Sequence, residues 1–432
     1  MVDEANRKPR GNPGYRPRSD VARQRPHGAV EVVSIATLRA ESAGPFGVRG
    51  RVVLVDAARA RIADESGTVD AHLSAGASAV SAGDLVEVTG QWDTRALMDA
   101  TATVVTRPSA PFPAAGGDFV RMERDGRARI TRLRQRAAVM TAIRAYFASE
   151  HFLEVETPLA VPSPGLDVHL DAVEARPFTS PRWLATSPEY QMKRLLVGGL
   201  QRIVQIGRVF RAGEVGARHQ PEFTMLEWYR AFAGAANVMR DTEELVASVA
   251  QTVLGSTVIP GLGGAAAIDV AAPWHRLTIR EAFRQCAGLD ADALDDERFY
   301  RTLTETIEPK LGFPKPVFLT EWPARMASLA RLCPHDATVA ERFEAFVGGV
   351  ELSNGFGELT DPSEQRARLF HDQEARRATG KAVYPIDERF LSALGEGMPP
   401  SGGNALGVDR LVMLVTGASD IREVLAFAED EL

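Results

Sequence analysis

Short runs of alternating apolar and polar residues follow one another in the first quarter of the chain. These runs cover residues 48–55, 60–63, 68–73, 85–90 and 101–106. Turn-forming residues separate them, among them Asp64-Glu-Ser-Gly67 and Ser81-Ala-Gly-Asp84. A period of two is the pattern of half-buried strands, and several short strands at this spacing are typical of a small closed barrel. We predict an all-β barrel of the OB-fold type over residues 29–107.

A linker and a larger second domain follow the barrel. Residues 108–125 begin with Pro-Ser-Ala-Pro-Phe-Pro-Ala-Ala-Gly-Gly, which has the composition of a linker. Apolar residues then recur at helical spacing beyond Thr131, a candidate N-cap, and a strand-like segment ends at Pro158. We assign residues 126–432 to one mixed α+β domain and interpret residues 242–311 as an insertion in it.

Two apolar arms in the centre of the chain enclose a polar loop. The arms are residues 203–210 and 223–229, and the loop is rich in Gly, Arg, His and Glu. This is the pattern of a β-hairpin. Arg211 closes the first arm and Glu227 lies between bulky apolar neighbours in the second, where a charge is costly without a partner. We expect a ligand to supply that partner.

The segment before the hairpin has the pattern of a helix start. In Thr186-Ser-Pro-Glu-Tyr-Gln-Met-Lys-Arg-Leu-Leu196, Ser187 stands at the N-cap, Pro188 at the first position and Glu189 in the first turn. A carboxylate in the first turn is favourable with the helix dipole. The residues alone therefore explain Glu189 as a capping charge and leave a role in a site open.

Acidic residues gather in an apolar, strand-like segment of the C-terminal third. On an extended chain Asn354 and Glu358 project to one face, and Glu344 and Glu351 lie nearby across a two-glycine bulge. Such carboxylates suit Mg²⁺, which takes one or two of them together with substrate phosphates, or they suit the amine of a substrate. A solvated strand face is the alternative, but the apolar neighbours favour burial.

A glycine-rich strand enters an apolar helix near the C-terminus. The segment Ser401-Gly-Gly-Asn-Ala-Leu-Gly-Val-Asp-Arg-Leu-Val-Met-Leu414 carries Arg410 at the start of that helix. An arginine is unfavourable at the positive end of a helix dipole unless an anion lies nearby. Arg410 and Arg211 thus offer two guanidinium groups that can grip a triphosphate, because their geometry suits bidentate contacts with phosphate.

Composition narrows the class of protein. The chain has 432 residues, 45% hydrophobic and 25% charged, which is ordinary for a globular protein of two or three domains. The net charge of −7 argues against non-specific nucleic-acid binding as the main activity. With two cysteines, Cys286 and Cys333, neither a disulfide framework nor a structural zinc site is expected. Because the sequence has no signal-peptide core and no long apolar run, we expect a cytoplasmic protein with a disordered basic tail over residues 1–28.

The motifs together resemble those of class II aminoacyl-tRNA synthetases. Residues 152–158 match motif 1 with its Pro158, residues 208–229 match motif 2, and Gly407-Val-Asp-Arg410 matches motif 3. The resemblance implies an antiparallel six-stranded sheet flanked by helices, a homodimer through motif 1, and ATP-dependent formation of an aminoacyl adenylate with Mg²⁺. The barrel resembles the anticodon-binding OB domain of the lysyl, aspartyl and asparaginyl enzymes.

Within that family, three segments resemble the lysyl branch. They are residues 186–196, residues 351–360 and His219-Gln-Pro-Glu-Phe-Thr-Met-Leu-Glu-Trp-Tyr229. These segments are closer still to the elongation factor P β-lysyl ligases, which attach β-lysine to a lysine of elongation factor P. Ser187 and Ala405 match those ligases, where lysyl-tRNA synthetases usually have Ala and Gly. The resemblance implies lysine or β-lysine as substrate and elongation factor P as acceptor.

The resemblance also implies a role for each matching residue around ATP. Arg211 would bind the α-phosphate and the substrate carboxylate, and Arg410 would bind the γ-phosphate. His219 would touch the phosphates, and Phe223 would stack on the adenine. The matched Mg²⁺ ligands are Glu344 and Glu351.

An amine pocket is implied in the same way. Glu227, Tyr229 and Glu358 match the residues around the ε-ammonium group of the substrate. Glu189 and Asn354 match the contacts to the other end of the amino acid. Attack of a carboxylate on the α-phosphate needs no protein nucleophile, so positioning and charge neutralisation suffice for the chemistry.

Departures from the family pattern leave the acceptor open. The usual Phe-Arg-x-Glu of motif 2 is here Phe-Arg-Ala-Gly-Glu214, and Gln220 stands where Asn is common. In the barrel, Arg59 and Asp70 occupy the positions of the anticodon-reading Phe and Gln. We therefore predict a ligase that modifies elongation factor P. The alternatives are an enzyme that charges tRNA or another small acceptor, and a non-catalytic RNA-binding pseudo-synthetase.

Overall fold

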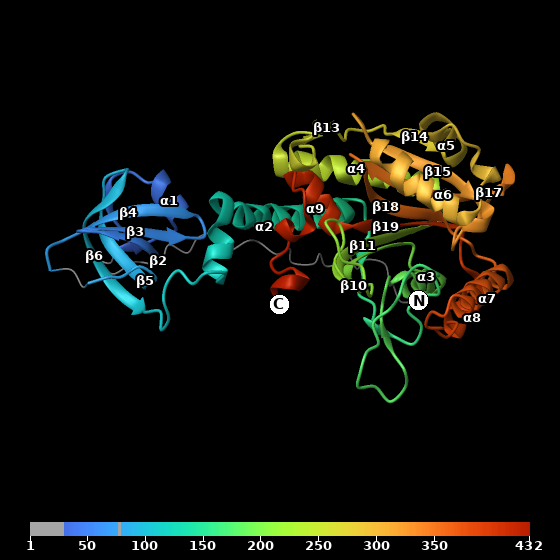
Figure 1. Cartoon of the computed structure of the whole chain (residues 1–432), viewed down its shortest axis with the longest axis horizontal. Coiled ribbons are helices and arrows are strands. Elements are labelled where there is room, and N and C mark those ends of the chain that lie inside the picture. The colour runs from blue at the N-terminus through green and yellow to red at the C-terminus, as the bar shows by residue number, and fades with distance from the viewer. Residues whose placement is uncertain (1–29, 77–78) are drawn as a thin grey trace, which may run out of the picture. The chain divides into compact units, whose positions relative to one another are not determined.

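The computed structural model describes residues 30–76 and 79–432 (Figure 1). They form two compact units, which divide between Arg121 and Met122. The basic tail expected over residues 1–28 lies outside the described residues. No helix in the described ranges combines the length and the apolar character that crossing a membrane requires.

The N-terminal unit is a closed five-stranded barrel. Its strands pair in the order β2-β3-β4-β6-β5, and β5 pairs back with β2. This architecture is consistent with the OB-like barrel that the alternation predicts, and each strand is longer than expected. The elements are β1 (Glu31–Val32), α1 (Ile35–Ala40), β2 (Gly44–Asp56), β3 (Arg59–Asp64), β4 (Gly67–Leu73), β5 (Leu85–Trp92) and β6 (Ala96–Thr106).

The barrel keeps its tryptophan inside. Trp92 is 3% exposed, and its Nε1 donates a hydrogen bond to the carbonyl of Glu41. On the strand pair β3-β4, Arg61 donates two hydrogen bonds to Asp70, at 2.7 and 3.1 Å, and Arg59 lies 4.0 Å from the same carboxylate. The indole is therefore not available for stacking on a base, and the Asp70 carboxylate is bound by arginine.

A nine-stranded sheet forms the centre of the second unit. Six consecutive strands, β15-β17-β18-β19-β11-β10, pair antiparallel, which confirms the predicted six-stranded antiparallel sheet. Parallel strands extend it, β14 beside β15 and β7 beside β10, while β16 pairs with β17. The strands are β7 (Leu153–Glu154), β10 (Arg202–Phe210), β11 (Glu222–Ala231), β14 (His275–Thr278), β15 (Val317–Pro323), β16 (Leu332–Cys333), β17 (Asp336–Val347), β18 (Val350–Gly357) and β19 (Ser401–Gly407).

Helices cover both faces of this sheet (Figure 1). Helices α2, α4 and α9 pack on one face, against Leu226 and Trp228 of β11, and α3 and α8 pack on the other, against Tyr229. The helices are α2 (Asp118–Ser149), α3 (Glu189–Val197), α4 (Ala235–Leu254), α5 (Ile279–Ala287), α6 (Asp296–Thr302), α7 (Pro362–Ala378), α8 (Glu388–Gly397) and α9 (Val408–Thr416). Two short strand pairs, β8 (Ala160–Val161) with β9 (Trp183–Leu184) and β12 (Val258–Ile259) with β13 (Ile268–Asp269), complete the unit.

The start of the first long helix differs from the prediction. Helix α2 begins at Asp118, and its backbone leaves helical geometry at residues 124–127 before it continues. Thr131 lies inside the helix, where its hydroxyl donates to the carbonyl of Arg127, so it is not an N-cap. The apolar stripe identified the helix, but it does not identify the kink.

The region over residues 242–311, which we predicted as an insertion, begins inside a helix of the core. Thr242 lies in the middle of α4, is fully buried, and accepts a hydrogen bond from Asn404 Nδ2 at 2.8 Å. Strand β14 extends the main sheet. The region therefore supplies part of the core, because α4 covers one face of the sheet.

The two glycines expected in a bulge instead form the turn between β17 and β18. Gly348 and Gly349 have φ angles of 61° and 72°, which glycine adopts without strain and which a two-residue hairpin requires. The irregular register lies earlier, between Ala345 and Phe346. Glu344 and Glu351 thus come from two adjacent strands.

Candidate active site

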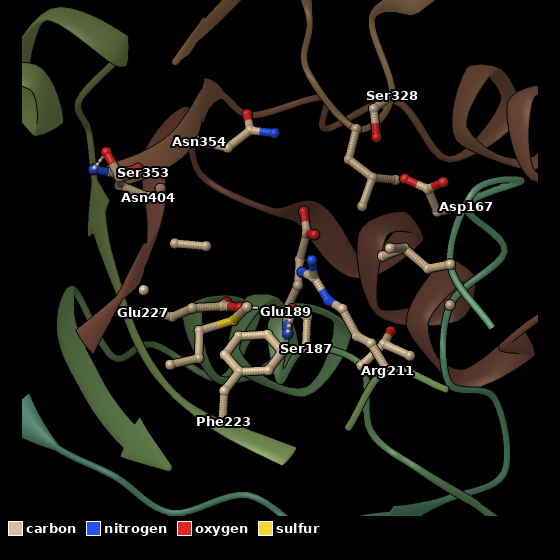
Figure 2. A pocket seen from close by; sticks show the side chains of 18 of the residues that line it. Asp167, Ser187, Glu189, Arg211, Phe223, Glu227, Ser328, Ser353, Asn354 and Asn404 are labelled. Atoms are coloured by element: carbon tan, nitrogen blue, oxygen red, sulfur yellow. Dashed lines mark hydrogen bonds between the residues drawn. The ribbon is translucent and has the colours of Figure 1, made fainter. Parts of the chain in front are cut away.

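A cavity of about 410 Å³ lies against β11, β18 and β19. The start of α3, residues 163–170 and the loop between β10 and β11 complete its walls, and Figure 2 shows their side chains facing one another. Two predicted residues, Glu344 and Pro158, lie outside its lining. The predicted residues that line it are Ser187, Glu189, Arg211, His219, Phe223, Glu227, Tyr229, Glu351, Asn354, Glu358, Ala405 and Arg410.

Strand β11 presents every second side chain to this cavity. Phe223, Met225, Glu227 and Tyr229 line it, whereas the intervening Trp228 lies in the core on the opposite face. Successive side chains of a strand point to opposite faces, so an acid in an apolar strand can face a site while its neighbours fill the core. The pleat therefore explains the position of Glu227.

One end of the cavity is cationic. Arg211 follows β10, and its guanidinium carbon lies 5.2 Å from the centroid of the Phe223 ring. Its Nε is buried, with no hydrogen-bond partner among the described residues, and Glu214 Oε1 is 3.9 Å from Nη1. A buried donor without an acceptor costs free energy. This end therefore fits an anion, with the Phe223 ring beside it for a flat group.

Arg410 extends the cationic end. In the first turn of α9, its Nη1 donates to the carbonyl of Glu351 at 2.8 Å and lies 3.2 Å from the carboxylate of the same residue. Its Nη2 is 2.6 Å from His219 Nε2. Burial and the charge of Arg410 lower the pKa of His219, so a neutral imidazole accepts this hydrogen bond.

Arg218 is a further cation of the cavity that the sequence analysis did not single out. Its Nη1 donates to the carbonyl of Gly349 at 2.7 Å, and burial together with Arg410 lowers its pKa. Crowding of like charges of this kind is relieved when an anion binds between them. The sequence signal that could have identified Arg218 is its position next to His219 in a polar loop.

The acids predicted as metal ligands lie at the same end. Glu344 is 7% exposed and accepts a hydrogen bond from Arg342 Nη2 at 2.7 Å. Burial and the charge of Glu351 raise the pKa of Glu344, and they raise that of Glu308 to about 7. Within the described ranges, no three acidic, His or Cys side chains are placed to hold a metal ion together. The two carboxylates alone are therefore no complete site, and Mg²⁺ bound there would take its remaining ligands from phosphate oxygens, as this ion commonly does.

The other end of the cavity is acidic and lined with hydroxyl groups. Glu227 is 1% exposed and accepts hydrogen bonds from Ser187 Oγ at 2.6 Å and from the Tyr229 hydroxyl at 3.0 Å. Burial and the neighbouring charge of Glu189 raise the pKa of Glu227 to about 7. The Ser187 hydroxyl also accepts from the backbone N–H of Glu189. A bound ammonium group would stabilise the ionised form of Glu227.

Lys193 completes the acidic end from behind. Its Nζ lies 2.6 Å from Glu189 Oε1 and 2.5 Å from Glu358 Oε2. Lys193 was not among the residues predicted from the sequence. The sequence signal that could have identified it is its spacing of four residues from Glu189, which places both side chains on one side of a helix.

Comparison with known proteins agrees with this geometry. Residues 119–431 match the family described as tRNA synthetases class II (D, K and N). The chain belongs to this family. It is also 40% identical over 322 residues to a protein of Dehalococcoides mccartyi named lysine–tRNA ligase. That match covers 68% of this chain and 63% of the relative, which is less than two thirds of the relative's length.

In this member of the class II family, small residues of β19 leave room beside the acids. Ala405 lies opposite Asn354 in the strand pair β18-β19. The Oδ1 atom of Asn354 is buried and accepts no hydrogen bond from the described part of the chain. A Cβ atom at Gly403 would lie 2.3 Å from both Glu358 Oε1 and Tyr229 Cε1. Glycine is therefore required at position 403 of β19, because side chains of the cavity wall approach the backbone closely there.

The segment that we predicted as motif 1 lies apart from the cavity. Pro158 lines a separate hollow together with Glu156, Arg194 and Arg389. The neighbouring Leu159 is 45% exposed. This segment is a surface feature of the chain.

Proposed function

We propose that this chain is an ATP-dependent ligase that activates lysine or β-lysine as an aminoacyl adenylate and transfers it to a lysine side chain of elongation factor P. The observation that supports it most is the division of one cavity into a cationic end, at Arg211 and Arg410, and an acidic end, at Glu227. A triphosphate suits the first end and a long amine suits the second. The name of the relative, a lysine–tRNA ligase, supports lysine as the substrate.

The first step joins the amino acid to the nucleotide. A carboxylate oxygen of the amino acid attacks the α-phosphorus of ATP, an acyl-phosphate bond forms, and the bond to pyrophosphate breaks. In this proposal Arg211 neutralises charge on the α-phosphate, while Arg218 and Arg410 hold the departing pyrophosphate. Preorganised charges can supply most of the acceleration, because no protein nucleophile takes part. When bound beside Glu344 and Glu351, Mg²⁺ would neutralise further phosphate charge.

The second step transfers the activated amino acid. The neutral amine of the acceptor lysine attacks the carbonyl carbon of the adenylate, an amide bond forms, AMP leaves, and the amine loses its proton to solvent. The motif 2 loop, with the displaced Glu214, is the segment that we assign to meeting the acceptor. This assignment connects the irregular motif to the choice of acceptor.

Two residues that differ from the usual lysyl-tRNA synthetase pattern, Ser187 and Ala405, support β-lysine over α-lysine as the substrate. The Ser187 hydroxyl donates to Glu227 and accepts from the backbone of Glu189, so it adds a polar group between two amine-binding acids. Ala405 lies opposite Asn354 and takes more room than a glycine would. In β-lysine one amino group is attached one carbon further from the carboxylate than in α-lysine, and we assign both altered residues to accommodating that shift.

The barrel supports a protein acceptor over tRNA. Aromatic side chains on a surface are what single-stranded nucleic acid stacks on, and Trp92 is buried. Asp70 is held by Arg61 in place of an amide that could pair with a base. A tRNA acceptor remains the second candidate because of the relative's name. A non-catalytic role is disfavoured, because buried charges without a ligand only destabilise a fold.

Labelling decides between the acceptors. The purified protein is incubated with ATP, Mg²⁺, radiolabelled α-lysine or β-lysine, elongation factor P and total tRNA, and the protein and RNA fractions are counted separately. We expect label in elongation factor P. Label only in the tRNA fraction would favour the second candidate, and no amino-acid-dependent pyrophosphate exchange would favour the non-catalytic one. The proposal also includes a homodimer formed through residues 152–158.

A further inference from the structure

Lys193 is a buried cation one helical turn after Glu189. Its side chain is fully buried, and it makes ion pairs with Glu189 and Glu358, which come from α3 and from the residue that follows β18. Both carboxylates line the cavity, whereas Lys193 does not. The ammonium group therefore touches the acidic end from the protein interior and leaves the space in front of it to a ligand.

The charges of this cluster depend on one another. Burial alone would lower the pKa of Lys193, but the charges of Glu189 and Glu358 outweigh burial and raise it above the ordinary value. Burial raises the pKa of Glu358, and the charge of Lys193 opposes that rise. Lys193 thus stays an ammonium ion and favours the ionised form of Glu358. Glu227 and Tyr229 face the cluster from β11, and Tyr190 of α3 interacts electrostatically with Glu189.

Lys193 is also the group that orients Glu358. Neither carboxylate oxygen of Glu358 has a well-directed hydrogen bond within the described residues, so the ion pair at 2.5 Å is its polar contact. Lys193 approaches Oε1 of Glu189 and Oε2 of Glu358.

We infer that Lys193 is a positioning residue for amino-acid selection: from behind the cavity, its ammonium group holds the carboxylates of Glu189 and Glu358 in place, so that the acidic end can bind the ammonium groups of the substrate. Three carboxylates, those two and Glu227, line this end. The internal ammonium ion pairs with two of them and leaves their cavity side, together with Glu227, to the ammonium groups of a diamino monocarboxylic acid, whose own carboxylate then lies at the cationic end. The inference rests on the amino-acid activation step of the proposed function and not on the acceptor.

The test is the pH dependence of KM for lysine, measured as amino-acid-dependent pyrophosphate exchange with the full chain and no acceptor. Lys193→Met keeps the length of the side chain and removes its charge. We expect the KM for lysine to rise about tenfold at pH 7 and to fall again as the pH is raised by about one to two units, because Glu358 has lost the cation that opposes its protonation and then ionises only at higher pH. The KM for ATP should stay the same. A variant with the wild-type profile would overturn the inference, because a merely structural role lowers the amount of active enzyme without moving the profile.

A second pair of variants keeps the test decisive if Lys193→Met does not fold. Glu358→Gln and the double variant Lys193→Met/Glu358→Gln differ in Lys193 alone, and removing both members of a buried pair leaves no unpaired charge between them. We expect the double variant to have the higher KM for lysine of the two, with the same KM for ATP, because Glu189 has lost the ammonium group that holds it in place. Equal KM values for lysine would reject the inference. A wild type that exchanges with neither lysine nor β-lysine would reject the proposed function as well.

Discussion

At the scale of single residues, the buried Nε of Arg211 decides how the cationic end works. A donor without an acceptor among the described residues is costly in the free protein and is satisfied when an anion binds. We predict that Arg211→Ala lowers the rate of lysine-dependent pyrophosphate exchange by about 100-fold, as loss of a transition-state donor commonly does. Arg208→Ala is the matched control, because Arg208 is exposed on β10, the strand that Arg211 follows, and lies outside the cavity lining. Equal loss in both variants would contradict the assignment.

The raised pKa of Glu227 gives a second prediction at this scale. An acid binds an ammonium group in its ionised form, and below a pKa of about 7 the neutral form dominates in the free protein. The KM for lysine should therefore rise toward tenfold for each unit that the pH falls below about 7, while the KM for ATP changes little. Glu227→Gln should raise the KM for lysine throughout and remove this dependence. A KM for lysine that is flat between about pH 5.5 and 7.5 in the wild type would contradict the role.

At the scale of elements, β19 is shaped by what lies beside it. Gly403→Ala would place a Cβ atom 2.3 Å from Glu358 Oε1 and from the ring of Tyr229, so the cavity wall must move. We predict a loss of about 1–3 kcal/mol in the free energy of unfolding, as overpacking commonly costs, together with a raised KM for lysine. Gly395→Ala in α8 is the control, because a Cβ atom there meets open space. Urea denaturation measures the first effect, and unchanged stability of Gly403→Ala would refute the close contact.

The same elements show which features are readable from sequence. The hairpin β10-β11 was predictable because a charge in an apolar strand and a polar loop are local signals. The role of α4 was not, because an amphipathic stripe does not tell which sheet face a helix will cover. The role of Lys193 was not predictable for a related reason. Its burial depends on Glu358, which is far away in the sequence, and a lysine four residues after a glutamate is usually a solvated surface pair.

At the scale of the whole molecule, the two units carry different parts of the proposed function. The second unit, Met122–Leu432, holds every residue that lines the cavity, and the barrel has its own core. In the proposed function, the activation step therefore depends on one unit, whereas the choice of acceptor involves features of both. We assign the departures at Glu214 and at Asp70 to the acceptor, and neither lies in the amine pocket. This separation is why pyrophosphate exchange and acceptor labelling test different parts of the proposal.

Association of two chains is the last property at this scale. Strand β7 ends the order of the main sheet, Leu153 on it is 52% exposed, and Leu159 is 45% exposed close by. Apolar side chains beside a free strand edge favour association. We predict that light scattering at micromolar concentration gives about twice the chain mass of 46.8 kDa. Leu153→Glu should give the single-chain mass, whereas Leu54→Glu, at a barrel residue that is 42% exposed, should leave the dimer intact. A wild-type protein with the single-chain mass would contradict the dimer.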